Sequence, residues 1–144
     1  NGIFKMPEDI RRDHDRAFAV QLGLYQKYAR GIEAVARDNG VKTSYFMQPS
    51  PAWNKALTEE EKRVVGDLSY RDLYRRIVEG MLTLRERGMA IFDLGDVFAG
   101  ETGTIYADHI HFLRDAQGES RGNRLIAARM GQLLAETWRL QRKP

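Results

Sequence analysis

The apolar run Met89-Ala90-Ile91-Phe92-Asp93-Leu94 is the most informative part of the chain for its architecture. It follows Gly88, and it is too apolar for one of its faces to lie in water. Such a run predicts a buried strand of a parallel sheet, because these strands are covered by helices on both faces. Residues 41–48 are also rich in strand-forming side chains and end at Pro49-Ser50-Pro51, which predicts a second strand that leads into a rigid loop.

Helical patterns surround these two strands. Apolar residues recur at three- and four-residue steps over the first part of the chain, and Asn39-Gly40 is a stop signal. Thr58 followed by Glu61 forms a capping box, which predicts the start of a short helix. Ser69 is expected to cap a further helix. The predicted helices cover residues 7–39, a short segment from Thr58, residues 70–87 and residues 121–141.

The order helix, strand, helix, strand, helix predicts an α/β fold with parallel strands. A two-stranded parallel sheet that stands alone is marginal, since strands this apolar need neighbours at both edges. We therefore expect residues 1–144 to form one partial domain. Either further strands precede Asn1, or a strand-completing partner or second copy of the chain supplies them.

The bulk composition excludes several classes of protein. A net charge of +3, from 23 basic and 20 acidic residues, is too small to indicate nucleic-acid binding. No apolar run approaches the ~18 residues that span a bilayer, so we expect no membrane insertion. The chain has 0 cysteines, which excludes disulfides and thiolate chemistry but leaves the compartment open.

A candidate catalytic pair follows the second predicted strand, in the segment Tyr106-Ala107-Asp108-His109-Ile110-His111. Asp108 and His111 are three residues apart, a separation at which a turn brings two side chains together. A carboxylate that holds one imidazole nitrogen leaves the other free to accept a proton, and the unperturbed imidazole pKa of ~6.5 suits that task. The pair therefore predicts the base end of a hydrolytic triad.

Two other arrangements are compatible with the same segment. Asp108 can cap a turn while His111 is an ordinary surface or packed histidine. Alternatively His109 and His111, two residues apart, can share one side of an extended segment and bind zinc or another divalent ion together with Asp93, Asp96 or Asp108.

A serine nucleophile is hard to find. The candidates are explained by local roles in turns, strands and helix caps, because none follows a tight strand-to-helix elbow that would expose its hydroxyl beside amide donors. Among them, Ser50 is the least implausible, since it lies at the carboxyl end of a predicted strand. The candidates are Ser44, Ser50, Ser69 and Ser120.

These segments together resemble the C-terminal block of the SGNH hydrolases, the GDSL esterase family. The D-x-x-H pattern at Asp108 and His111 is followed by Gly122-Asn123-Arg124-Leu125-Ile126-Ala127 at the start of the last predicted helix. The resemblance extends back to the predicted strands at residues 45–49 and 91–94. It covers most of this chain but only the C-terminal half of the family.

The resemblance implies a three-layer, flavodoxin-like sheet without its N-terminal strands, a small ester as substrate, and no cofactor. Asp108 and His111 would be the acid and base of the triad. The family's Gly-Asp-Ser and Gly-x-Asn motifs are absent from the 144 residues. We therefore expect this chain alone to be inactive, and a non-catalytic binding or assembly module of the same fold is the alternative.

Overall fold

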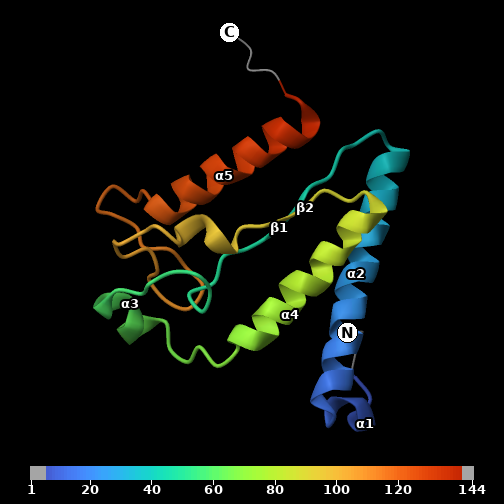
Figure 1. The fold of residues 1–144 in the computed structure, drawn as a ribbon, viewed down its shortest axis with the longest axis horizontal. Coiled ribbons are helices and arrows are strands. Elements are labelled where there is room, and N and C mark those ends of the chain that lie inside the picture. The colour runs from blue at the N-terminus through green and yellow to red at the C-terminus, as the bar shows by residue number, and fades with distance from the viewer. Residues whose placement is uncertain (1–5, 141–144) are drawn as a thin grey trace.

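The computed structural model describes residues 6–140, in which helices alternate with two strands (Figure 1). The α/β class is confirmed in this coarse form. In chain order the elements are α1 (Glu8–Arg11), α2 (His14–Asp38), β1 (Tyr45–Met47), α3 (Glu59–Val64), α4 (Arg71–Leu82), the 3-10 helix η1 (Thr83–Arg87), β2 (Ile91–Asp93), the 3-10 helix η2 (Gly95–Phe98) and α5 (Arg121–Trp138).

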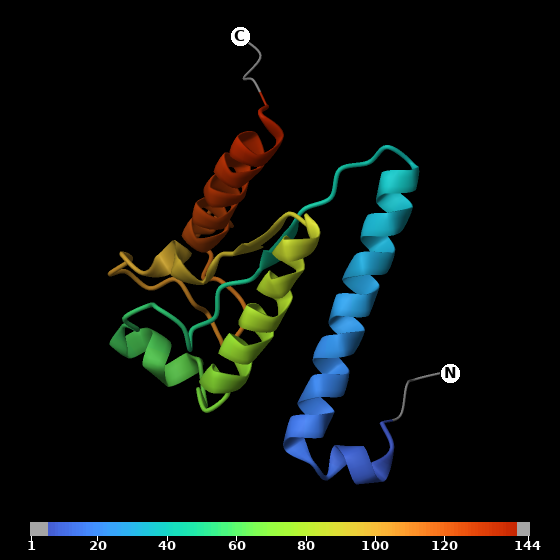
Figure 2. The same cartoon turned by 45° about the vertical axis from the view of Figure 1, so that its right-hand side comes forward.

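β1 and β2 form a two-stranded parallel sheet in which Tyr45 lies opposite Ile91. Helices lie on both sides of this sheet, with α5 on one side and α2 and α4 on the other (Figures 1 and 2). Alternate strand residues therefore enter two different apolar layers. Tyr45 and Ile91 pack toward α2 and α4, whereas Phe46 and Phe92 stack on each other on the opposite face, with ring centroids 5.3 Å apart.

Two hydrophobic clusters hold these layers together. The first joins α2, α4 and the sheet, and Gly80 of α4 allows the side chain of Leu22 to approach its backbone closely. The second lies under the segment that carries the candidate site, where Val65, Phe98, Ile105 and Tyr106 are buried against the first half of α5. The second cluster thus fixes the base of the candidate site.

Two helix predictions were wrong in detail. The single helix expected over residues 7–39 is divided, because the side chain of Asp13 accepts a hydrogen bond from the amide of Arg16 at 3.0 Å and starts α2. Ser69 does not cap α4, because its hydroxyl donates to Asp67 at 2.6 Å. By contrast, the capping box of Thr58 is confirmed.

The strands are shorter than predicted. The sequence predicts strands over residues 41–48 and 89–94, but only three residues of each are paired. A strand is defined by its partner, and each strand has only the other one as neighbour in the part of the chain that the structure describes. The other residues of the predicted strands at 41–48 and 89–94 therefore lie outside the sheet, although their side chains are strand-forming.

Two glycines of α5 provide a test of the packing under the candidate site. A Cβ on Gly122 would lie 2.8 Å from Phe112 Cγ, whereas a Cβ on Gly131 would meet nothing within 4 Å. We expect Gly122→Ala to destabilise the fold by about 1–3 kcal/mol through overpacking, and Gly131→Ala to be neutral or to stabilise it by up to about 1 kcal/mol. Urea unfolding followed by circular dichroism measures both, and equal stabilities would contradict the described packing.

Candidate functional site

The candidate pair lies at the tip of a narrow hairpin. Tyr106 and Phe112 form an antiparallel bridge. Beyond this bridge, the amide of Ala107 donates to the carbonyl oxygen of His111 at 2.9 Å, and the amide of Leu113 donates to Ile105 at 2.7 Å. The segment between η2 and α5 therefore contains a hairpin, which we call the 105–113 hairpin.

Asp108 and His111 contact each other as their spacing predicts. Oδ1 of Asp108 accepts hydrogen bonds from the amides of Ile110 and His111, each at 2.7 Å. Oδ2 lies 2.8 Å from Nδ1 of His111. The backbone amide of His111, then its ring, then the amide of Ile110 lower the pKa of the Asp108 carboxyl well below its ordinary value. The aspartate is therefore ionised at neutral pH.

This contact determines the tautomer of a neutral His111. An ionised carboxylate can only accept, so Nδ1 carries the hydrogen and donates it to Asp108, while Nε2 keeps its lone pair. The His111 side chain is 75% exposed. The arrangement thus presents a proton acceptor to solvent and a negative charge behind it.

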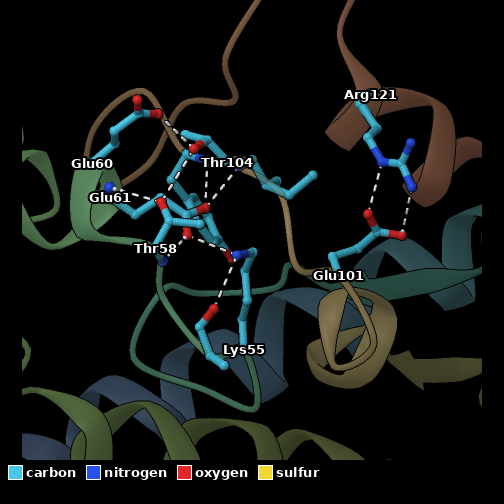
Figure 3. A network of polar contacts seen from close by, with 10 residues as sticks. Lys55, Thr58, Glu60, Glu61, Glu101, Thr104 and Arg121 are labelled. Atoms are coloured by element: carbon cyan, nitrogen blue, oxygen red, sulfur yellow. Dashed lines mark hydrogen bonds and ion pairs between the residues drawn. The ribbon is translucent and has the colours of Figure 1, made fainter.

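The hairpin is anchored to the rest of the molecule by one buried carboxylate, that of Glu61 (Figure 3). Its Oε1 accepts hydrogen bonds from the amides of Ile105 at 2.8 Å and Tyr106 at 3.1 Å. Its Oε2 accepts from Nζ of Lys55 at 2.7 Å and from the amide of Thr58 at 2.8 Å. The side chains of Lys55 and Glu61 are both 0% exposed, so the two form a buried ion pair.

Burial alone would raise the pKa of the Glu61 carboxyl, but its four hydrogen-bond donors outweigh that effect and lower the pKa. The sequence showed Glu61 only as half of a capping box, and no pattern singled out Lys55. The contact between Glu61 and Ile105 joins residues 44 positions apart, which no local spacing can indicate.

Aromatic side chains fill the space below the hairpin. Tyr106 packs edge-on against Phe98 at 5.7 Å and is only 1% exposed. Burial raises the pKa of its hydroxyl, which has no hydrogen-bond partner among the described residues. Tyr106 and Phe112 both belong to this packed cluster.

A cleft of about 310 Å³ opens beside the tip of the hairpin, between the loop after β1 and helix α4. The loop after β1 and the 105–113 hairpin, which follows β2 in the chain, therefore meet at the carboxyl end of the sheet. The residues that line the cleft are Gln48, Pro49, Ser50, Tyr70, Tyr74, His109 and Ile110.

The serine candidates have local hydrogen-bonding roles. Ser50 lines the cleft but is buried, and its hydroxyl lies 3.1 Å from the hydroxyl of Tyr70 and 3.2 Å from the amide of Ala52. Ser120 caps α5 as expected, and Ser44 accepts from the indole of Trp138 at 3.2 Å. None of these serine hydroxyls forms a hydrogen bond with His111.

The alternative metal site finds no support in the geometry. Among residues 6–140, no three side chains of histidine, aspartate or glutamate gather as ligands for a metal ion. Asp93 instead accepts a hydrogen bond from the amide of Gly95 at 2.7 Å, and Asp96 accepts one from the side chain of Asn54.

Comparison with known protein families, curated proteins and solved structures finds no match for this chain. None of the helices over residues 6–140 is long and apolar enough to cross a membrane. The functional inference therefore depends on the residues and the geometry described above.

The buried pair should be sensitive to removal of one partner. We expect Lys55→Met to destabilise the fold by about 3–5 kcal/mol, because it leaves the Glu61 carboxylate buried without its cation. The double variant Lys55→Met with Glu61→Gln should recover part of this loss, since the amide oxygen still accepts from the backbone. Arg121→Met, at a pair with Glu101 whose side chains are 62% and 17% exposed, should cost much less, because water still reaches both groups. Urea unfolding measures all three, and equal costs for Lys55→Met and Arg121→Met would contradict the buried pair.

The tautomer of His111 provides a test of the candidate pair. We expect ¹⁵N NMR at a pH where the ring is neutral to show hydrogen predominantly on Nδ1. Asp108→Asn should shift the ring toward the Nε2-protonated tautomer, because the amide no longer offers a full negative charge. His109, which makes no described contact with Asp108, serves as the internal reference. An unchanged tautomer ratio at His111 would show that the contact does not orient the ring.

Proposed function

We propose that this chain supplies the acid and base of a serine-type ester hydrolase of the SGNH kind. In this proposal it forms the later strands and helices of a three-layer, flavodoxin-like domain. One observation carries the proposal: Oδ2 of Asp108 lies 2.8 Å from Nδ1 of His111, whose side chain is 75% exposed. The neighbouring residues His109 and Ile110 line a cleft at the tip of the same hairpin. The carboxyl end of a parallel sheet is where α/β proteins place their chemistry.

In the complete enzyme, Nε2 of His111 would take the proton from the hydroxyl of a serine that this chain does not supply. The serine oxygen would then attack the carbonyl carbon of a small ester. Asp108, ionised because its pKa is lowered, would stabilise the imidazolium that forms. The imidazolium would return its proton to the departing alcohol, and a water molecule activated by His111 would hydrolyse the acyl-serine in the same way.

The second candidate is a non-catalytic binding or assembly module of the same fold. It is favoured by the serines themselves, since the described serine candidates all have local hydrogen-bonding roles. In that case Asp108 and His111 would only close the hairpin tip. The two candidates differ in whether a nucleophile ever meets Nε2 of His111.

Hydrolysis of nitrophenyl acetate separates the two candidates. We expect this chain alone to give the same rate as its His111→Ala variant. A polypeptide that also includes the sequence encoded upstream of Asn1 should hydrolyse the ester, with kcat falling about 10⁴-fold or more on His111→Ala. His109→Ala should have little effect. If the longer polypeptide is inactive, or if His111→Ala leaves its rate unchanged, the hydrolase proposal is wrong.

A further inference from the structure

The two edges of the sheet differ in how their backbone groups are used. At the outer edge of β2, the carbonyl oxygen of Ile91 accepts a hydrogen bond from Nε of Arg85 at 2.6 Å. A charged side chain at this position blocks the addition of another strand. The outer edge of β2 is therefore protected.

The outer edge of β1 has no such protection. Tyr45 and Met47 direct their backbone groups toward β2, with the amide of Tyr45 donating to Ala90 at 2.8 Å and the carbonyl of Met47 accepting from Leu94 at 3.1 Å. Because backbone groups alternate along a strand, the N–H and C=O of Phe46 point to the opposite edge. No lysine or proline interrupts residues 44–48.

An apolar surface lies on α2 and on the segment that leads into β1. It is formed by Tyr28, Ile32 and Val35 of α2 together with Val41, which are 66%, 56%, 64% and 58% exposed. The helical members are spaced four and three residues apart, so they share one face of α2. They line a groove of about 780 Å³ that extends to Thr43, two residues before β1. We call these four residues the α2 docking surface.

The handedness of the connections between parallel strands indicates which segment would pair with the outer edge of β1. β1, α4 and β2 form one crossover, and α2 lies on the same face of the sheet as α4 (Figure 2). Crossovers between parallel strands are right-handed in almost all proteins. Two crossovers with helices on one face must progress across the sheet in one direction. A strand that leads into α2 would therefore lie on the side of β1 away from β2.

We propose that the open edge of β1 pairs with an apolar strand that runs parallel to it and continues into α1 and α2. The α2 docking surface covers one face of that strand. A second copy of the chain fits less well, because a twofold axis at this edge would pair β1 with itself antiparallel. The inference rests on the proposed function only in assigning this strand to the polypeptide that also carries the nucleophile.

The test compares two polypeptides, this chain and the same chain preceded by its upstream coding sequence, with the upstream serines changed to alanine. We expect Phe46 amide exchange to slow roughly tenfold or more in the longer polypeptide, as for a newly hydrogen-bonded amide. NMR contacts from residues 45–47 to an added strand should show the parallel register.

Paired substitutions sharpen this comparison. Ile32→Asp with Val35→Asp should leave the melting temperature of this chain unchanged, because both side chains are exposed, but should lower that of the longer polypeptide, where the aspartates would be buried. The control Val64→Asp, at a 45% exposed residue of α3, should leave both unchanged.

Three outcomes would overturn the proposal: the double variant affects both polypeptides equally, no strand is encoded upstream, or light scattering shows a dimer of this chain that the double variant dissociates. None of these measurements uses hydrolysis. Esterase activity is measured separately, on the longer polypeptide with its serines unchanged. A docked strand together with no activity of that polypeptide would refute the proposed function alone, and activity without protection of Phe46 would refute the docking alone.

Discussion

The Glu61 side chain is fully removed from water, and the arrangement of the candidate site depends on how its charge is compensated. An ionised carboxylate in such a position is costly unless it is paired and hydrogen-bonded. Lys55 supplies the opposite charge, while the amides of Thr58, Ile105 and Tyr106 supply three further donors. These donors come from the loop before α3 and from the 105–113 hairpin. One side chain therefore requires both segments to be in place at the same time.

The candidate site is consequently built at two levels. Asp108 closes the hairpin tip through bonds to its own near neighbours, so the contact with His111 is a local property of a few residues. The position of that tip relative to the sheet is instead set from below, by Glu61 and by the packing of Phe112 against Gly122. A change in the lower level should move the pair as a unit and leave its internal geometry intact.

This division explains which features could be predicted from the sequence. The capping box of Thr58 and the contact of Asp108 with His111 depend on a spacing of three residues, which the sequence displays directly. The Lys55 interaction and the anchoring of Ile105 depend on the tertiary fold, which no spacing encodes. Ser69 shows the opposite error: a serine at a suitable position prefers a nearby carboxylate to the helix it was expected to cap. The strands were recognised by composition, but their paired length depends on neighbours.

The open edge of β1 and the candidate pair are related through the direction of the sheet. All strands of a parallel sheet finish at the same end of the sheet, its carboxyl end. The loop after β1 already meets the hairpin there, where Ser50 and His109 line one cleft. A strand added beside β1 and parallel to it would also finish at the carboxyl end of the sheet. Its following loop would leave the sheet at the same end as the hairpin that carries His111, whereas an antiparallel strand would place that loop at the far end. The direction of the added strand, more than its sequence, therefore determines whether a nucleophile on it could reach the exposed ring nitrogen.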